Sequence, residues 1–236
     1  MDCQIIILAA GKGSRMKSEL PKVMHKIGDQ TMLDMVIANA SGVTSDLILV
    51  HSATLEEYLV GCNIHKVLQP EPLGTAHAVF CVLEKINPEK DVVILYGDNP
   101  FINSDLIISA LSYHGSQDNH ITVIVSERAD PKGYGRVMLD GNGAVSDIIE
   151  CSDTSEETSK ITLCNSGIMA FAPGILQKYL PACINRSRNV NNSELYLTEI
   201  IEICSNAGEK VSYYTSKNHH LVIGINTQEE LQAAND

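Results

Sequence analysis

Residues 5–27 read IIILAAGKGSRMKSELPKVMHKI, in which a short apolar run leads into a glycine-rich turn and then into a basic segment. A near-continuous apolar run of this length is typical of a parallel strand that is covered on both faces. In open α/β sheets, ligands bind at the carboxyl ends of the strands, where the backbone N–H groups of such a turn can face an anion. The stretch therefore predicts a buried strand that ends in a phosphate-binding loop.

The charge around this turn is unusual for the chain. Five of its seventeen Lys and Arg residues lie within positions 12–26 although the formal net charge is −12: Lys12, Arg15, Lys17, Lys22 and Lys26. Two better-known loops are excluded, because Met16 stands where both the Walker pattern and G-x-G-x-x-G require glycine. On composition alone, a tight turn with a solvated charged face remains the alternative to a phosphate site.

The same kind of apolar run recurs along the first half and alternates with amphipathic segments, which is the pattern of β-α-β units. We predict strands at 5–10, 47–51, 66–69, 92–96 and 121–126, with helices near 31–41, 54–61, 74–86 and 104–113. The second half differs: strands at 133–139 and 144–150 flank the turn Asp140-Gly141-Asn142-Gly143, a strong hairpin pattern. A strand near 162–172, a helix near 193–206 and an exposed loop at 152–160 complete the prediction.

These elements predict an α/β fold, with a Rossmann-like, mixed but mostly parallel sheet flanked by helices and a smaller β-hairpin lobe. Without repeats or a Pro/Ser-rich linker, we expect one domain over 1–236, with the β-α-β half at 1–126 and the half that contains the hairpin at 127–236.

Composition narrows the classes of molecule that this chain can be expected to bind. The sequence pI of about 5.0 opposes the basic surface that nucleic-acid binding needs. Seven widely spread cysteines, with no C-x-x-C pair, indicate neither a disulfide framework nor a zinc site and fit a reducing cytoplasm. No secretory signal or apolar stretch of membrane-spanning length is recognised, so no membrane partner is expected.

The segment LAAGKGSRMKSELPKVMHKI at 8–27 resembles the N-terminal signature of the nucleoside-diphosphate-sugar pyrophosphorylases. It is most similar to the uridyltransferase half of the bifunctional bacterial enzyme that makes UDP-N-acetylglucosamine. The short spacing from Arg15 to Lys22 distinguishes it from the hexose thymidylyltransferases and guanylyltransferases, and Ser14 stands where the family usually has Thr. The resemblance implies catalytic roles for Arg15 and Lys22. It implies nucleotide binding by Leu8, Ala9, Ala10, Gly11, Gly13 and Lys22.

A second match is Gln69-Pro70-Glu71-Pro72-Leu73-Gly74-Thr75-Ala76-His77, from the end of a predicted strand into a helix. In the family this segment holds the uracil, which implies nucleotide binding by Gln69, Gly74 and Thr75. The Gln69 side chain has both a donor and an acceptor for the base edge. Glycine at position 74 has no side chain and so allows the backbone to approach a ligand closely. Standing alone, such a segment is an ordinary strand-to-helix turn.

A third match is Tyr96-Gly97-Asp98-Asn99-Pro100, which ends a predicted strand. A carboxylate there can hold a hard cation such as Mg²⁺, although a lone Asp is otherwise a helix cap or turn former. The resemblance makes Asp98 a catalytic metal ligand and Asn226, 128 positions later, the second ligand. Only the family pattern links these two residues.

The resemblance also implies a set of sugar-binding residues, of which Tyr96 lies in the first half of the chain and the others in the second. The family binds the sugar hydroxyls and acetamido group through residues that correspond here to Tyr96, Gly135, Glu150, Asn165 and Thr198. Each alone has an ordinary structural explanation, such as a bulged strand or a turn asparagine. Leu195 replaces the first of two tyrosines found in many members. By helical spacing alone, Leu195, Ile200 and Ile201 are core residues.

The resemblance covers residues 5–226 and does not include the hexapeptide-repeat acetyltransferase half, so no acetyl transfer is expected of this chain. It implies a Mg²⁺-dependent uridylyltransferase acting on UTP and N-acetylglucosamine 1-phosphate, with a nucleotide-binding half at 1–126 and a sugar-binding half at 127–236. Three alternatives remain: the same chemistry with another base or another sugar or alcohol phosphate, a non-catalytic regulatory module, and a redox dinucleotide-binding domain. Retention of Arg15, Lys22 and Asp98 disfavours the second, and Met16 disfavours the third.

Overall fold

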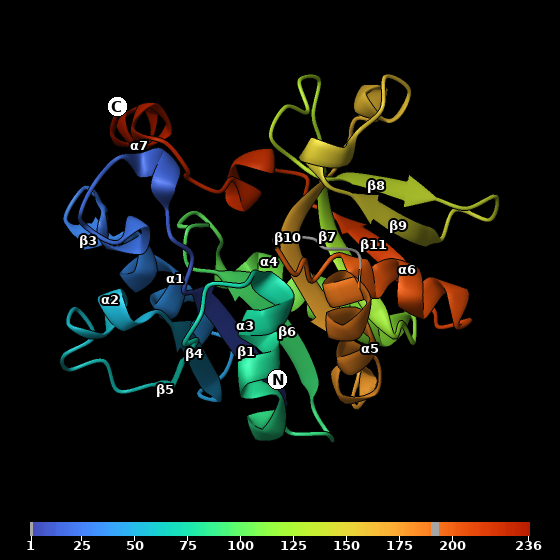
Figure 1. The fold of residues 1–236 in the computed structure, drawn as a ribbon, viewed down its shortest axis with the longest axis horizontal. Helices are drawn as coiled ribbons and strands as arrows, with labels where there is room; N and C mark the ends of the chain where they lie inside the picture. The colour runs from blue at the N-terminus through green and yellow to red at the C-terminus, as the bar shows by residue number, and fades with distance from the viewer. Residues whose placement is uncertain (1, 190–193) are drawn as a thin grey trace.

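A nine-stranded mixed sheet forms the centre of the computed structural model, which describes residues 2–189 and 194–236 (Figure 1). Its main path runs β11-β7-β10-β6-β1-β4-β5, and the hairpin β8–β9 joins it through β10. All neighbours on the main path are parallel except those of β10. The strands are β1 (Cys3–Ala9), β4 (Leu47–His51), β5 (His65–Leu68), β6 (Asp91–Tyr96), β7 (Ile121–Glu127), β8 (Arg136–Leu139), β9 (Val145–Ile149), β10 (Leu163–Phe171) and β11 (Val211–Thr215).

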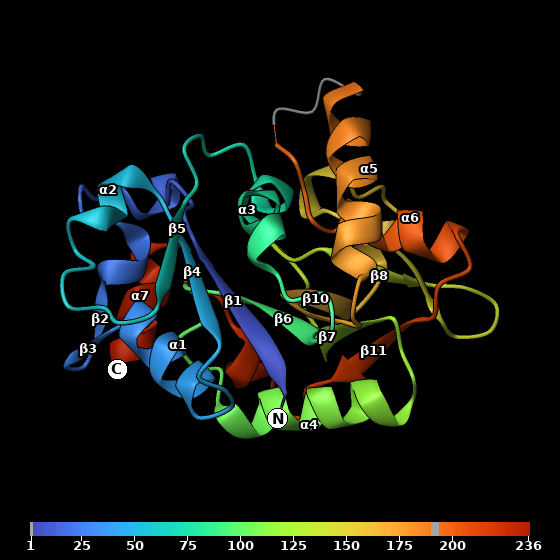
Figure 2. The same ribbon diagram turned by 90° about the horizontal axis from the view of Figure 1, so that it is seen from below.

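Helices cover both faces of this sheet, as Figure 2 shows from below. One face carries α1 (Met32–Ser41) and α4 (Ser104–Ser116), and the other carries α3 (Thr75–Val82), α5 (Ile175–Asn189) and α6 (Glu199–Asn206). The short α2 (Ala53–Glu56) connects β4 to β5. The C-terminal α7 (Gln228–Asn235) lies beside the small sheet of β2 (Lys26–Ile27) and β3 (Gln30–Thr31).

The central strand β1 shows why this sequence forms three layers. Ile5 and Ile7 pack in the core beneath α1 and α4, while Ile6 and Leu8 pack in the core beneath α3. Because successive side chains of a strand point to opposite faces, a run that is apolar at every position fits only a sheet covered on both sides. Polar caps start the covering helices: Thr31 accepts from the Asp34 N–H, and Asn103 from the Leu106 N–H.

Strand register places the carboxyl ends of β5, β4, β1 and β6 together. Leu8 of β1 is in register with Tyr96 of β6, and His51 of β4 with Leu68 of β5. These four strands are parallel, so the segments that follow them emerge at one edge of the sheet. The glycine-rich turn, Gln69 and Asp98 are brought together there, at the position where open α/β sheets bind ligands.

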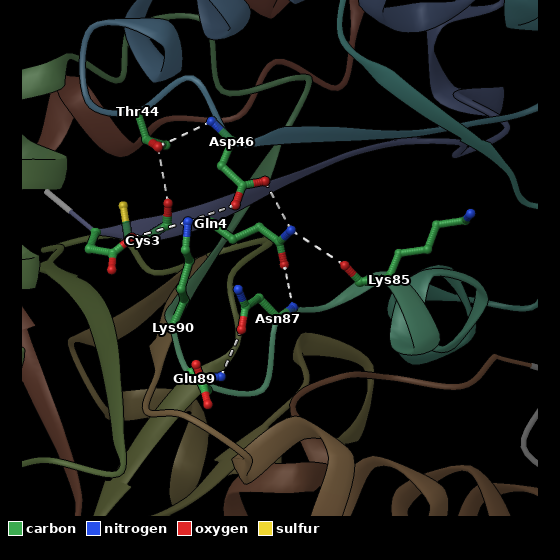
Figure 3. A network of polar contacts seen from close by, with 9 residues as sticks. Cys3, Gln4, Thr44, Asp46, Lys85, Asn87, Glu89 and Lys90 are labelled. Atoms are coloured by element: carbon green, nitrogen blue, oxygen red, sulfur yellow. Dashed lines mark hydrogen bonds and ion pairs between the residues drawn. The ribbon is translucent and has the colours of Figure 1, made fainter.

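The opposite, amino-terminal edge is held by a polar network centred on Gln4 (Figure 3). The buried Gln4 amide donates to Asp46 Oδ1 over 3.0 Å and accepts from the Asn87 N–H over 3.1 Å. Lys90 pairs with the other Asp46 oxygen at 3.1 Å. Because every one of these groups has a partner, the network fixes the loops before β4 and β6 without leaving a buried polar group unpaired.

The predicted fold class is confirmed, and most predicted strands match within a few residues. The predicted helix at 74–86 is α3 followed by a 3-10 turn at Leu83–Lys85, and the loop at 152–160 contains two 3-10 turns. The helix predicted at 54–61 is wrong beyond the single turn of α2. The turns after it leave Val60 90% exposed, so a longer helix would gain little burial.

The helix predicted near 193–206 begins only at Glu199, and residue 193 lies outside the described residues. Hydrogen bonds tie the backbone of Leu195 to the start of α3 and to the loop that precedes it. The Leu195 N–H donates to the Leu73 carbonyl over 2.7 Å, and the Leu195 carbonyl accepts from the Ala76 N–H over 2.8 Å. This tertiary pairing replaces helical hydrogen bonds. The predicted core residues Leu195, Ile200 and Ile201 are indeed buried.

Besides the two-residue strands β2 and β3, three longer helices and strands were not among the predicted elements. Helix α5 contains Pro181, a residue that normally ends helices. Strand β11 is short and only partly buried, and α7 has no buried residue, so neither shows a clear hydrophobic pattern. Within the described residues, no helix is both long and apolar enough to cross a lipid bilayer.

Candidate active site

A cavity of about 640 Å³ opens at the carboxyl ends of β1, β5 and β6. It is lined by thirteen of the predicted site residues: Leu8, Ala9, Ala10, Gly11, Gly13, Arg15, Lys22, Gln69, Gly74, Thr75, Tyr96, Asp98 and Asn226. Asn226 comes from the far end of the chain. The structure therefore brings all predicted nucleotide and metal residues into one cavity.

The glycine-rich turn owes its shape to two local features. Gly13 has φ +59°, and a Cβ there would lie 2.7 Å from the Cβ of Lys22. Only glycine allows the turn to fold back this closely onto the Lys22 segment. The 3-10 turn Ser14–Met16 follows, with Met16 1% exposed in the core. Burial of Met16 fixes the turn, so that the neighbouring Arg15 faces the cavity.

Arg15, Lys22, Asp98 and Asn226 form one charged cluster. The Lys22 ammonium pairs with Asp98 Oδ2 and lies 3.1 Å from Asn226 Oδ1, which also accepts from the Arg15 guanidinium over 3.0 Å. The Lys22 and Asp98 side chains are only 14% and 16% exposed. A backbone hydrogen bond of 2.9 Å from the Ile225 N–H to the Asp98 carbonyl holds the segments of Asp98 and Asn226 side by side, although they are far apart in the sequence.

This cluster fits a magnesium ion. The Asp98 and Asn226 oxygens already share one compact cation, the Lys22 ammonium, so they lie close enough to share another. Both are hard oxygen donors, and Mg²⁺ commonly takes one or two protein oxygens and completes its shell with phosphates and water. Among the described residues, no group of three or more His, Cys, Asp or Glu side chains is placed to hold a metal.

Segment 69–77, which is predicted to hold the nucleotide base and is called the base segment below, is rigid around Gly74. This residue has φ +117°, and a Cβ there would lie 2.5 Å from the Leu195 carbonyl oxygen. The buried Gln69 donates its amide Nε2 to the Gly74 carbonyl over 3.1 Å and lies 3.1 Å from His77 Nδ1. Thr75 accepts from the Leu197 N–H over 2.9 Å. The segment is thus anchored to the 195–197 stretch of the other half.

The predicted sugar residues form a second group next to the cavity, and only Tyr96 also lines the cavity itself. A Cβ at Gly167 would lie 2.8 Å from the Tyr96 ring, and Asn165 accepts from the Gly167 N–H over 2.9 Å. Gly135 accepts from the Asn165 N–H over 2.9 Å. These contacts connect Tyr96 to the hairpin lobe.

Glu150 and Thr198 complete this second group. The Thr198 hydroxyl donates to Glu150 Oε1 over 2.6 Å, and Gly135 lies against the same carboxyl group. Burial raises the pKa of Glu150, while the hydrogen bond from Thr198 lowers it and the charge of Glu194 raises it. Burial also raises the pKa of the Tyr96 hydroxyl. A buried acceptor beside an aromatic ring is suited to a hydroxyl-bearing ligand.

Six further residues line the cavity that sequence reasoning did not assign: Lys12, Ser14, Val23, Pro72, Ala78 and Glu194. Four of them lie inside the quoted motifs, so position alone could have suggested Lys12, Ser14, Val23 and Pro72. Ala78 follows Gly74 by one helical turn, a spacing that puts both on one face. Glu194 reaches the cavity through the pairing of residue 195 with the base segment, which no local pattern indicates.

Comparison with known proteins identifies the family of this chain. A family model described as MobA-like NTP transferase domain matches residues 5–185. The bifunctional protein GlmU of Alkaliphilus metalliredigens is 36% identical over 234 residues, which is 98% of this chain and 51% of the relative. GlmU of Saccharophagus degradans is 37% identical over 229 residues, 95% of this chain and 49% of the relative. The chain thus spans about half the length of these curated relatives.

Two solved structures share the fold. A putative glucose-1-phosphate thymidylyltransferase from Bacillus anthracis aligns with a TM-score of 0.78 at 18% identity, covering 99% of this chain and 94% of that one. A UDP-glucose pyrophosphorylase complexed with UDP-glucose aligns with a TM-score of 0.74 at 17% identity, covering 100% and 97%. The family model matches most of the chain and includes the glycine-rich turn, Gln69 and Asp98, so this chain belongs to the MobA-like NTP transferase domain family.

Proposed function

We propose that this chain transfers the uridylyl group of UTP to N-acetylglucosamine 1-phosphate, forming UDP-N-acetylglucosamine and pyrophosphate. The observation that carries the proposal is the single cavity in which a glycine-rich turn, two cations and an oxygen pair for Mg²⁺ meet the Gln69 segment. The resemblance of residues 5–226 to the uridyltransferases supports the choice of base and sugar, as does the similarity to GlmU proteins.

The chemistry needs no general base. A sugar 1-phosphate is already an ionised nucleophile, so the protein has to align it with the α-phosphorus and neutralise charge on the leaving pyrophosphate. We assign Arg15 and the backbone of 11–15 to the β- and γ-phosphates. Lys22 is assigned to the space between the α-phosphate and the sugar phosphate, where charge is greatest in the transition state.

Magnesium, when bound, would neutralise charge on the phosphates, and Asp98 and Asn226 are the residues that would hold it. In the free protein, Lys22 balances the charge of Asp98. A divalent cation held there would also balance the charge of Asp98, and the Lys22 ammonium would then be available to the phosphates. Arg15 contacts the same Asn226 oxygen, so both basic residues start within reach of the metal ligands.

The sugar is assigned to the group formed by Tyr96, Gly135, Glu150, Asn165 and Thr198. In this proposal residues 1–126 supply most of the nucleotide site and residues 127–236 supply the sugar site, with Asn226 returning to the metal. Acidic net charge argues against nucleic acid as a partner, and the cysteine usage fits a cytoplasmic enzyme.

The test is product analysis by mass spectrometry with a panel of nucleotides and sugar phosphates in the presence of Mg²⁺. We expect UDP-N-acetylglucosamine and pyrophosphate from UTP and N-acetylglucosamine 1-phosphate. Faster turnover with another nucleotide, or with glucose 1-phosphate, would reassign the substrate. Glucosamine 1-phosphate and acetyl-CoA should give no acetylated product with this chain.

A further inference from the structure

The amide of Gln69 has little hydrogen-bonding capacity left for a ligand. An amide nitrogen carries two hydrogens, and Nε2 of Gln69 lies 3.1 Å from the Gly74 carbonyl oxygen and 3.1 Å from His77 Nδ1. The reverse amide orientation would set the Gln69 oxygen against the Gly74 oxygen, which is repulsive. Nε2 is therefore committed inward, and only Oε1, an acceptor, is left to face the cavity.

His77 supplies the second partner that holds the Gln69 amide in this orientation, and its Nδ1 has two neighbours of opposite kind. Gln69 Nε2 is a donor at 3.1 Å, while the Glu71 carbonyl is an acceptor at 3.0 Å. A ring nitrogen carries either a lone pair or a proton, so it can serve only one of them. Gln69 is 5% exposed whereas Glu71 is exposed to solvent.

Burial settles this competition in favour of Gln69. A buried amide hydrogen without an acceptor loses its full solvation, whereas the Glu71 carbonyl already accepts from the Leu73 N–H over 2.8 Å. Nδ1 then bears the lone pair and the proton resides on Nε2, where Cys81 Sγ at 3.9 Å offers a weak acceptor. Two of the three ring contacts, those with Gln69 and Cys81, are consistent with this tautomer, and the Glu71 carbonyl keeps the Leu73 N–H as its donor.

We propose that His77 is a positioning residue that holds the Gln69 amide with only its oxygen toward the base, and thereby selects uracil over cytosine. Uracil has one donor on its pairing edge, N3–H, between two carbonyl acceptors. Cytosine has an acceptor at N3, which an amide oxygen would repel. A site whose buried polar group is left unpaired by the wrong substrate discriminates strongly against that substrate.

This inference rests on the proposed function only for the nucleotide class. The test therefore measures binding and turnover separately. Dissociation constants for UTP and CTP with Mg²⁺ come from calorimetry without sugar, and kcat/KM for each nucleotide comes from pyrophosphate release. If the unmodified chain binds UTP but makes no product with N-acetylglucosamine 1-phosphate, the proposed function fails while the binding test of His77 still stands.

Two variants and one control decide the role of His77. His77→Leu removes the acceptor for Gln69 and should lower the UTP-to-CTP preference about tenfold, with the KM for the sugar phosphate unchanged. His77→Asn keeps an acceptor at the δ position and should retain the preference within about threefold. His65→Leu makes the same change at an exposed histidine of β5 and should match the unmodified chain.

A folded His77→Leu variant with the original UTP-to-CTP preference would overturn the proposal, and so would a preference of the unmodified chain for CTP. If His77→Leu does not fold, nitrogen-15 NMR of the unmodified chain decides between the two tautomers. We expect the lone pair of the His77 ring on Nδ1 and the proton on Nε2. A protonated Nδ1 would contradict the proposed contact with Gln69.

Discussion

Gly74→Ala should destabilise this protein and weaken UTP binding together. The position has φ +117° and ψ −179°, a region open essentially only to glycine, and forcing another residue into it costs about 1–3 kcal/mol. The new Cβ would also meet the Leu195 backbone oxygen at 2.5 Å and nitrogen at 2.6 Å. Relieving that clash means giving up one of the backbone hydrogen bonds of Leu195, about 1 kcal/mol more.

The summed cost is about 2–4 kcal/mol, which for a chain of this size lowers Tm by roughly 4–16 °C. The Gly74 carbonyl also accepts from Gln69, so the KM for UTP should rise. Thermal unfolding and steady-state kinetics measure the two effects. Gly115→Ala is the control: Gly115 lies in α4 with no atom within 4 Å of the added Cβ, and the change should stabilise the helix by about 0.5–1 kcal/mol. A Gly74→Ala variant with unchanged Tm and KM would refute this reasoning.

Four other substitutions test the assigned chemistry. Asp98→Asn should lower kcat by about 10²–10³-fold and weaken the Mg²⁺ dependence while Tm changes little; normal turnover at the original Mg²⁺ requirement would remove Asp98 from the metal site. Lys22→Ala should act mainly on kcat, by roughly 10²–10³-fold, whereas Arg15→Ala should also raise the KM for UTP, and a folded Lys22→Ala variant with near-normal kcat would contradict the role of Lys22. Glu150→Gln should lower the affinity for the sugar phosphate yet stabilise the free protein at high pH. Burial raises the pKa of Glu150 above its ordinary 4.5, so its protonated form favours folding and this contribution is lost as pH rises through the raised pKa. Unfolding curves from pH 4 to 8 should show the Tm advantage of Glu150→Gln growing with pH, and a constant or shrinking advantage would argue against a desolvated carboxylate.

Glu194 is the site residue that local sequence could least predict. It lines the cavity because the Leu195 backbone pairs with Leu73 and Ala76, more than a hundred positions earlier. The same pairing delays the start of α6 to Glu199 and makes Gly74 essential for close approach. A helical pattern read from 193 onward contains no information about a partner segment that is distant in sequence. Propensity therefore predicted helix where tertiary hydrogen bonds impose an irregular backbone.

Sequence alone determined the strands of the first half and the residues at their carboxyl ends, since apolar periodicity and glycine-rich turns are local properties of the chain. It also indicated, through the family resemblance, that Asp98 and Asn226 belong together. Only the tertiary structure decided how they meet: the Ile225 N–H bonds to the Asp98 carbonyl, and Lys22 occupies the space between the two oxygens. It likewise showed that the donor of Gln69 is already committed to Gly74 and His77. Partners of this kind depend on distances and burial between segments that are far apart in the chain, and no pattern within one segment encodes them.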